Sequence, residues 1–332
     1  MTYRFRYRSY RLPLRVPLRT AHGRWGEREG LLVRLEDEAG RVGYGEIAPI
    51  PWFGSETLAE AEEICRALGD RVADQVLDAV AARFGCVRFA LAAARAREDA
   101  PVPTSARLPV AALLPAGRAG LAALPDKLEA GFMAFKWKVG VESPDEELGV
   151  FDDLLGLLPA YTRLRLDANG AWERRHAQRW LASCADRPVE FVEQPVAAGD
   201  DDTLLGLARE FPVTLALDES VVRLADAKRW QGLGWPGVFV IKPALCGPLA
   251  EIGQWIGETK ADVVFSSAIE TASARADILR FVLAADLTKR ALGFGTGEMF
   301  GERLWDGPFV GALADAACTI DENREARLNA LN

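Results

Sequence analysis

The chain has 332 residues, of which 49% are hydrophobic and 27% charged, and its net charge is −8. This composition is typical of a folded enzyme and is too apolar for a disordered chain. The negative charge argues against a nucleic-acid-binding protein, and the lack of any run of about 18 apolar residues predicts no membrane span. Five widely spaced cysteines without a CxxC pair predict reduced thiols and a cytoplasmic location.

The first hundred residues predict a small α+β domain. Six arginines and no acidic residue occur in residues 1–19. The strict alternation of arginines with aromatic residues predicts a strand over 3–11 rather than a targeting helix. A hairpin follows, and two Ala-rich segments with apolar residues at helical spacing predict helices. The hairpin joins 31–35 to 42–46, and the helices cover 57–68 and 87–97.

The rest of the chain alternates short apolar strands with helical segments. The expected strands lie at 108–115, 133–138, 163–167, 189–193, 213–217, 238–241, 262–266 and 291–294. This repeat predicts a parallel barrel, and the chain length suits a barrel of roughly 250 residues with a smaller companion. We therefore expect an α/β protein, with an α+β domain over 1–105 and a modified (β/α)8 barrel of the TIM type over 106–302. Residues 303–332 lack the repeat and are expected to pack back onto the first domain.

Five charged residues mark the ends of successive predicted strands. They are Lys138, Asp167, Glu193, Asp218 and Lys242, which lie 24 to 29 residues apart and each close a short apolar run. The C-terminal ends of barrel strands form one face, and the active sites of such barrels lie there. The spacing therefore predicts one cavity that receives three carboxylates and two lysines.

Asp167, Glu193 and Asp218 would present their carboxylates around a shared point. Hard oxygen ligands without His or Cys favour Mg²⁺, with Mn²⁺ as a substitute, over Zn²⁺. Any one of them could instead be a helix N-cap, and Asp218 precedes Glu219 and Ser220 as such a cap would. Three acids in phase on consecutive strands favour the metal site.

Lys136 and Lys138 alternate on one predicted strand, so both side chains face the same side and Trp137 faces the other. Burial and the neighbouring positive charge are expected to lower the pKa of such lysines toward the range of a general base. Lys242 would approach from the opposite side of the barrel, which places a lysine on each face of a bound substrate. The alternative is that these lysines lie on the helix-facing side and form salt bridges. A dication beside two lysines suits proton abstraction next to a carboxylate.

The segments FKWKVG, LRLDANGAW, FVEQP, LALDES and VIKP resemble the enolase superfamily, in the branch with two lysines on the second barrel strand and one on the sixth. The resemblance covers essentially the whole chain. It implies a (β/α)7β barrel with a capping domain built from both ends of the sequence. It also implies Mg²⁺ bound by Asp167, Glu193 and Asp218, with Lys138 as the general base and Lys136 lowering its pKa.

Within the superfamily the chain most resembles the syn-dehydratases of menaquinone and phylloquinone biosynthesis. The expected reaction converts 2-succinyl-6-hydroxy-2,4-cyclohexadiene-1-carboxylate to 2-succinylbenzoate through an enediolate. Lys138 would remove the α-proton and return a proton to the departing hydroxyl, and Lys242 would stabilise the enediolate by a cation–π contact. The loops SSAIET (266–271) and GFGTGEMF (293–300) resemble those that bind substrate carboxylates in this branch. The candidate substrate contacts are Ser266, Ser267, Gly295, Thr296 and Gly297.

Two residues near the ligands have further expected roles. Arg165 alternates in phase with Asp167 and is a candidate substrate contact. Asn169 is expected to orient the metal ligands rather than to bind the ion. The two histidines, His22 and His176, follow no predicted strand end and have no expected role.

The segments 18–28 and 49–56 are rich in Gly, Trp and Pro. By analogy with the superfamily they would close over the barrel mouth and exclude water, with Trp25, Trp52 or Phe53 lining the pocket. A plain surface hairpin is the alternative.

The same machinery serves other reactions. Racemisation of N-acylamino acids or epimerisation of dipeptides would also use both lysines. The sequence GTGE follows the last strand, where dipeptide epimerases show an Asp-x-Asp pair, and this counts against a substrate with a free amino group. A lyase that forms a Schiff base on Lys138 or Lys242 and a barrel without activity are further alternatives. The expected partner is a small-molecule carboxylate, without nucleic acid or membrane, and the expected assembly is a monomer or small homo-oligomer.

Overall fold

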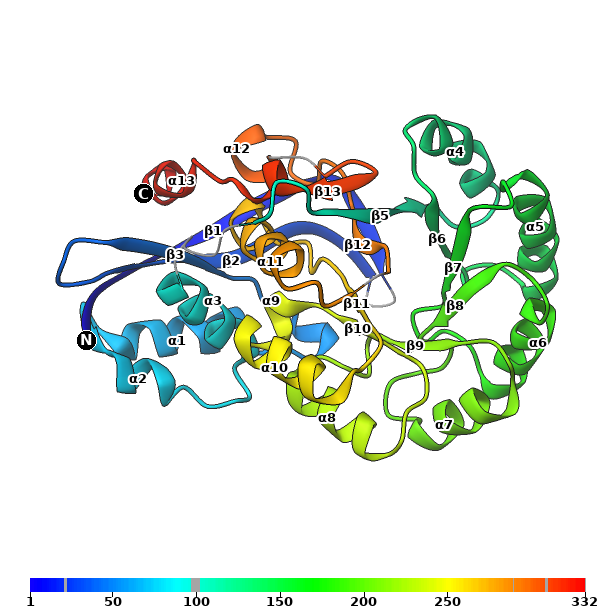
Figure 1. The fold of residues 1–332 in the computed structure, drawn as a ribbon, viewed down its shortest axis with the longest axis horizontal. Coiled ribbons are helices and arrows are strands. Elements are labelled where there is room, and N and C mark those ends of the chain that lie inside the picture. Colours follow the sequence, from blue (N-terminus) through cyan, green and yellow to red (C-terminus); the bar gives the residue numbers. More distant parts are fainter. Residues whose placement is uncertain (21–22, 97–101, 289, 308–309, 332) are drawn as a thin grey trace.

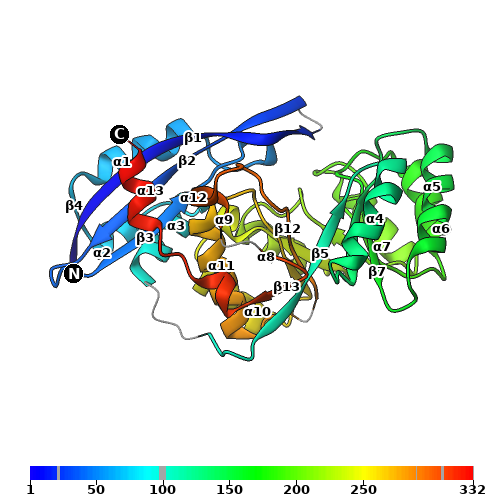
Figure 2. The same cartoon turned by 90° about the horizontal axis from the view of Figure 1, so that it is seen from above.

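The structure is a computed structural model that describes residues 1–20, 23–96, 102–288, 290–307 and 310–331. Figure 1 shows two parts: an antiparallel sheet with the first helices, and a ring of parallel strands enclosed by the later helices. In Figure 2 the long strands β1 and β2 lie above the last strands and helices of the barrel.

The N-terminal part is a four-stranded antiparallel sheet of order β3-β2-β1-β4 with helices on one side. Its strands are β1 (Thr2–Thr20), β2 (Gly23–Glu36), β3 (Val42–Ile47) and β4 (Arg71–Ala73), and its helices are η1 (Pro51–Phe53), α1 (Leu58–Leu68), α2 (Asp74–Asp78) and α3 (Gly85–Ala96). The predicted first strand, hairpin and two helices are confirmed, although β1 and β2 are longer than expected. The short β4 and α2 carry too few residues to show a period.

Two features of the sequence fix this packing. Helix α1 begins with a capping box, in which the side chain of Thr57 accepts from the Glu60 amide and Glu60 accepts from the Thr57 amide. Helix α3 lies directly on β3, because a Cβ added to Gly43 or Gly45 would come within 1.9 or 2.0 Å of a helix carbonyl. Glycine at these two positions therefore permits the close approach.

The barrel consists of eight parallel strands in the order β11-β10-β9-β8-β7-β6-β5-β12. They are β5 (Arg107–Leu114), β6 (Ala134–Lys138), β7 (Arg163–Asp167), β8 (Val189–Glu193), β9 (Leu215–Leu217), β10 (Val238–Ile241), β11 (Val263–Phe265) and β12 (Leu292–Gly295). Strand β12 pairs with β5, and a parallel bridge between Ser266 and Gly293 joins it to the end of β11. The predicted α/β fold is confirmed, and the seven strand–helix units before β12 give the expected (β/α)7β form.

Helices cover the outside of the barrel (Figure 1). They are α4 (Arg118–Glu129), α5 (Pro144–Leu157), α6 (Arg174–Cys184), α7 (Asp201–Glu210), α8 (Leu224–Gly232), α9 (Pro243–Cys246), α10 (Leu249–Thr259) and α11 (Ala272–Ala285). Trp137 points outward from β6 and packs edge-on against Trp180 of α6, with ring centroids 6.4 Å apart. Since successive strand residues point to opposite faces, this packing turns Lys136 and Lys138 into the barrel.

The C-terminal segment contacts both parts. It contains α12 (Arg303–Asp306), β13 (Leu313–Asp315), η2 (Ala316–Thr319) and α13 (Arg324–Ala330). Strand β13 pairs antiparallel with β5, whereas Glu325 of α13 accepts hydrogen bonds from Arg34 and Tyr44 of the antiparallel sheet. Figure 2 shows α13 beside this sheet. The boundaries after residues 105 and 302 stay predictions.

All five cysteines are buried and unpaired, as the sequence predicts. Within the described residues, none of the helices has the length and apolar character needed to cross a membrane.

Candidate active site

Three carboxylates lie at the C-terminal ends of adjacent strands. Parallel pairing aligns Asp167 of β7 with Lys138 on one side and with Glu193 of β8 on the other. Asp218 directly follows β9. All three acids are buried, and the strand register is therefore what gathers them.

The three lysines lie among these acids, inside the barrel. The Nζ atom of Lys136 is 2.8 Å from Oδ2 of Asp167 and 2.6 Å from Oε1 of Glu193. Lys242 forms an ion pair with Asp218. The alternative of outward-facing lysines is therefore wrong.

Burial and opposite charges set the protonation of these groups. Burial alone would lower the pKa of Lys136, but the nearby carboxylates of Asp167, Glu193 and Asp218 raise it above its ordinary value. Burial opposes ionisation of Asp167, yet the charge of Lys136 lowers its pKa. Burial, with the charge of Asp167, raises the pKa of Glu193 to about 8. The lowered pKa expected of two neighbouring lysines is wrong for Lys136, because the charges closest to it are carboxylates.

Asn169 links the base to the acids. Its Oδ1 accepts a hydrogen bond of 2.8 Å from Nζ of Lys138, and its Nδ2 donates to Oε1 of Glu219 over 3.1 Å. Its amide donates to Oδ1 of Asp167 over 3.2 Å. Asn169 adopts φ 45°, a left-handed conformation that asparagine tolerates better than most residues. The side chain of Asn169 thus holds Lys138 and Glu219, while its backbone amide holds the predicted ligand Asp167.

The sequence-based interpretation missed Glu219 as a site residue. It lines the cavity beside Asp218, and its Oε2 is buried without a hydrogen-bond partner among the described residues. Burial, together with the charges of Asp218 and Asp167, raises its pKa to about 7. The clue in the sequence is its place directly after a predicted ligand at a strand end.

The interpretation also gave no role to Gln194 in the FVEQP segment. The side chain is fully buried. Its Oε1 accepts the amides of Asp218 and Ser220, each over 3.1 Å, while Nε2 donates to the Val196 carbonyl and to the Ser220 hydroxyl. Gln194 thereby fixes the backbone that presents Asp218.

The chemistry of the donor set fits a hard dication. Four carboxyl groups lie beside three lysine side chains, and Oε2 of Glu219, which has no hydrogen-bond partner among the described residues, is a further oxygen that could bind a metal ion. Across the described part of the chain, no three His, Cys, Asp or Glu side chains are already arranged around one point. Lys136 and Lys242 contact the acids instead. Binding a dication would therefore require these ammonium groups to turn away from the carboxylates.

A cavity of about 570 Å³ opens above these groups. The N-terminal part, with strands β1–β4 and helices η1 and α1–α3, forms one side of it and is called the capping part below. Leu18 and Trp25 come from the arms of the β1–β2 hairpin, where they pair in register. The ring of Trp25 meets that of Trp52 edge-on, with centroids 4.8 Å apart. Phe53 lies over Lys242, with Nζ 4.3 Å from the ring centroid. The described residues of this segment thus form paired strands and also line the pocket, so a hairpin and a role at the barrel mouth are compatible.

The predicted substrate contacts divide into two groups. Ser266, Ser267 and Thr296 line the cavity. Gly295 is not among the lining residues, and a Cβ there would come within 2.1 Å of the Ala111 carbonyl, so it allows β12 to approach β5. Gly297 also lies outside the lining; it has φ 69°, which favours glycine in this turn.

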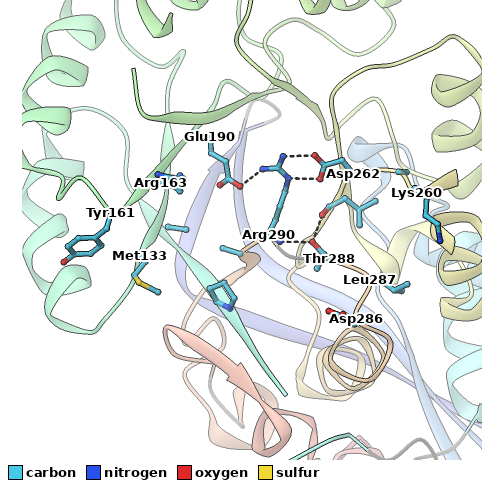
Figure 3. Close-up of a pocket in the computed structure, with 15 residues that line it drawn as sticks. Met133, Tyr161, Arg163, Glu190, Lys260, Asp262, Asp286, Leu287, Thr288 and Arg290 are labelled. Atoms are coloured by element: carbon cyan, nitrogen blue, oxygen red, sulfur yellow. Dashed lines mark hydrogen bonds and ion pairs between the residues drawn. The ribbon is translucent and has the colours of Figure 1, made fainter. Parts of the chain in front are cut away.

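Arg165 is not brought to this cavity. It lies two residues below Asp167 on β7 and pairs with Glu190, with Nε 2.7 Å from Oε2. Glu190 also pairs with Arg290, which binds Asp262 in turn. Figure 3 shows Glu190, Arg290 and Asp262 of this network. They line a second cavity of about 690 Å³, whose lining residues lie at the N-terminal ends of the strands. The structure therefore gives no support to a substrate contact by Arg165.

The histidines do not alter this arrangement. His176 is exposed on α6, and His22 lies outside the described residues.

Comparisons with known proteins agree with this geometry. Residues 3–98 match the family model described as "MenC, N-terminal domain", and residues 120–256 match "Enolase C-terminal domain-like". The chain is 40% identical to the o-succinylbenzoate synthase of Thermosynechococcus vestitus. The alignment spans 320 residues and covers 91% of this chain and 98% of the relative. The chain belongs to the o-succinylbenzoate synthase family of the enolase superfamily. The o-succinylbenzoate synthase of Pectobacterium atrosepticum is 33% identical, with 84% of this chain and 85% of that protein covered.

Solved structures include a member of the same family. The o-succinylbenzoate synthase of Thermosynechococcus elongatus BP-1, crystallised with Mg in its active site, matches with a TM-score of 0.86 and 37% identity over 98% of this chain and 100% of that one. The dipeptide epimerase of Enterococcus faecalis V583 matches with a TM-score of 0.82 and 22% identity over 97% of this chain and 100% of that one. The second match supports the superfamily fold alone.

Proposed function

We propose that this protein is an o-succinylbenzoate synthase, which removes water from 2-succinyl-6-hydroxy-2,4-cyclohexadiene-1-carboxylate to form 2-succinylbenzoate. One observation supports this proposal most strongly: Lys138, Lys242 and a cluster of buried acids lie together in one cavity. The chain is also 40% identical to a synthase over nearly its whole length. We further propose a cytoplasmic enzyme that is a monomer or small homo-oligomer.

Asp167, Glu193 and Asp218 would hold Mg²⁺, or Mn²⁺ in its place, with Glu219 beside them. When bound, the dication would polarise the substrate carboxylate, acidify the adjacent carbon and stabilise the negative charge that develops there. Gln194 would keep Asp218 in position, because it binds the backbone amides of Asp218 and Ser220.

Lys138 would carry both proton transfers. As the neutral amine it takes the proton from C1 of the substrate, and the electron pair of the C–H bond stays on the ring carbon. The C6–O bond then breaks as this pair forms the third ring double bond, and the Lys138 ammonium returns the proton to the departing oxygen. One water leaves, no electron carrier is needed, and a single base on one face explains a syn elimination.

The remaining residues would orient the substrate. Lys242 faces an aromatic ring already, that of Phe53, and the same cation–π geometry would suit the substrate ring. Ser266, Ser267 and Thr296 offer hydroxyls to the second carboxylate. The aromatic cap formed by Trp25 and Trp52 would exclude water from the reacting atoms.

Activity with and without metal tests the proposal. The protein with Mg²⁺ should consume the cyclohexadiene substrate, followed by loss of its absorbance, and EDTA should abolish this. Borohydride added with substrate should leave activity unchanged, because no Schiff base forms. Failure of the metal-loaded protein to dehydrate the substrate would refute the proposed function.

Racemisation of N-acylamino acids is a second candidate, since Lys138 and Lys242 could exchange an α-proton from opposite faces. N-succinylamino acids incubated in D₂O report on it through α-deuterium. Exchange without dehydration of the cyclohexadiene substrate would favour the racemase over the synthase.

A further inference from the structure

Arg28 of β2 is a buried cation whose hydrogen bonds join the walls of the cavity. Its side chain is 1% exposed, and within the described residues no carboxylate forms an ion pair with it. Instead it donates to five backbone carbonyls, those of Glu29, Ala48, Pro49, Ala268 and Ile269. A buried charge requires such compensation, and only arginine has five donors in a rigid fork.

The five carbonyls belong to segments that line the cavity. Arg28 Nη1 is 2.7 Å from the Pro49 carbonyl, directly before the residues Ile50, Trp52 and Phe53 of the cavity wall. Its Nε is 2.9 Å from the Ile269 carbonyl on the barrel loop after β11. The guanidinium also lies over the ring of Trp25, 5.5 Å from its centroid. Arg28 therefore contacts three walls of the cavity: the β1–β2 hairpin at Trp25, the segment 48–53 (the 48–53 wall) and the segment 268–271 after β11 (the barrel loop).

The barrel loop has a strained backbone at the point that Arg28 binds. Ile269 adopts φ 58°, a left-handed conformation that is rare and strained for a β-branched residue. Such strain persists only where the surroundings hold it. The contact of Arg28 with the Ile269 carbonyl is one such restraint.

The capping part also holds the far end of the same loop. Glu46 of β3 is fully buried and accepts hydrogen bonds from the amide and hydroxyl of Thr271 and from the amide of Ala274, at the start of α11. Within the loop, Glu270 accepts from the Ser267 hydroxyl and the Ala268 amide. Both ends of the segment 268–271 are thus fixed by side chains of the antiparallel sheet.

We propose that Arg28 is a positioning residue, which holds the 48–53 wall against the strained loop at Ile269 and so gives the cavity the shape that receives the substrate. Among the described residues its side-chain hydrogen bonds go to backbone carbonyls and not to the acids or lysines of the site, so it acts through the cavity walls and not on the reacting atoms. The proposal rests on the synthase activity proposed above for its kinetic readout.

The kinetic test compares two arginines of the same strand. Arg28→Lys and Arg28→Met should raise KM for the cyclohexadiene substrate at least tenfold, change kcat less than threefold, and leave Mg²⁺ affinity within twofold. Arg34→Met removes a side chain of β2 that pairs with Glu36 and Glu325 and should leave KM unchanged. A KM within twofold of the wild type in Arg28→Lys, or an equal rise in Arg34→Met, would overturn the proposal.

A second test isolates the backbone strain. Ile269→Gly and Ile269→Ala remove the same branched side chain, but only glycine adopts φ 58° without cost. In the Arg28→Lys background, the Ile269→Gly protein should have a KM at least fivefold below that of Ile269→Ala, whereas the two should agree within twofold when Arg28 is present. Equal KM values in both backgrounds would contradict a role in holding the strained loop.

A substrate-free measurement separates this proposal from the proposed function. Amide hydrogen exchange over residues 266–271 should be at least tenfold faster in Arg28→Lys than in the wild type, and unchanged in Arg34→Met. If the wild type fails to dehydrate the substrate, the function is refuted while exchange still tests Arg28. Unchanged exchange in Arg28→Lys refutes the role of Arg28 whatever the activity.

Discussion

Gln194 offers a sharp test of how the acid cluster is supported. The change Gln194→Met keeps the length and approximate volume of the side chain and removes its hydrogen bonds. The Oε1 atom accepts the amides of Asp218 and Ser220, and Nε2 donates to the Val196 carbonyl. All of these groups would lose a partner in a buried site.

The magnitude follows from the count of orphaned groups. Each buried polar group left without a partner costs about 1–3 kcal/mol. With two amides and one carbonyl affected at a fully buried position, the free energy of unfolding should fall by at least about 3 kcal/mol, a large part of the 5–15 kcal/mol typical of a folded protein. Loss of the restraint on Asp218 should also weaken Mg²⁺ binding by about 10- to 100-fold, as is usual when the partners of ligands are removed.

Urea unfolding and calorimetric titration with Mg²⁺ measure the two effects. Gln178→Met is the matched control, because among the described residues Gln178 on α6 forms only long hydrogen bonds of 3.4 Å with Glu210. This change should alter the unfolding free energy by less than about 0.5 kcal/mol. Stability within about 1 kcal/mol of the wild type, with unchanged Mg²⁺ affinity, would refute the role given to Gln194.

Two further predictions concern the metal site and the capping part. Burial raises the pKa of Glu193 to about 8 and of Glu219 to about 7, above the ordinary value of 4.5. Between these values the two carboxyl groups are protonated in the metal-free folded state and ionised in the unfolded state. The unfolding free energy of the metal-free protein should therefore fall as pH rises from about 5 to 8, and Mg²⁺ should bind more tightly at the higher pH with release of protons; stability rising over this range would contradict the assignment. Separately, Gly45→Ala should cost more than about 2 kcal/mol in urea unfolding because its Cβ would meet the Ala90 carbonyl at 2.0 Å, while Gly149→Ala, in open space on α5, should stabilise by up to about 1 kcal/mol. Equal effects of the two changes would refute the close packing of α3 on β3.

Periodicity predicted the barrel well, because five of its eight strands end at or directly before a charged residue that breaks an apolar run. Asp167 and Glu193 follow this rule, and the parallel register aligns them as the spacing requires. The alternation of side chains along a strand does not show which end of the barrel a side chain faces, and the prediction for Arg165 failed for this reason. Arg165 has the same phase as Asp167, but a partner on the next strand, Glu190, draws it toward the opposite end of the barrel.

The supporting residues could not be predicted for a different reason. Gln194 and Glu219 matter through hydrogen bonds and burial that arise only when neighbouring strand ends are brought together. Arg28 acts on carbonyls as far as 241 positions along the chain, a contact that no local pattern encodes. The pKa of Lys136 likewise depends on acids contributed by other strands.

We propose that Lys138 performs the proton transfer in a site completed by Lys242. The most direct measurement is the dehydration rate of the cyclohexadiene substrate, labelled with deuterium at C1, in the wild type and in Lys138→Ala with saturating Mg²⁺. We expect a slower rate with the labelled substrate in the wild type and a loss of at least about 100-fold in the variant, with Mg²⁺ still bound. A Lys138→Ala protein that dehydrates within tenfold of the wild type would contradict it.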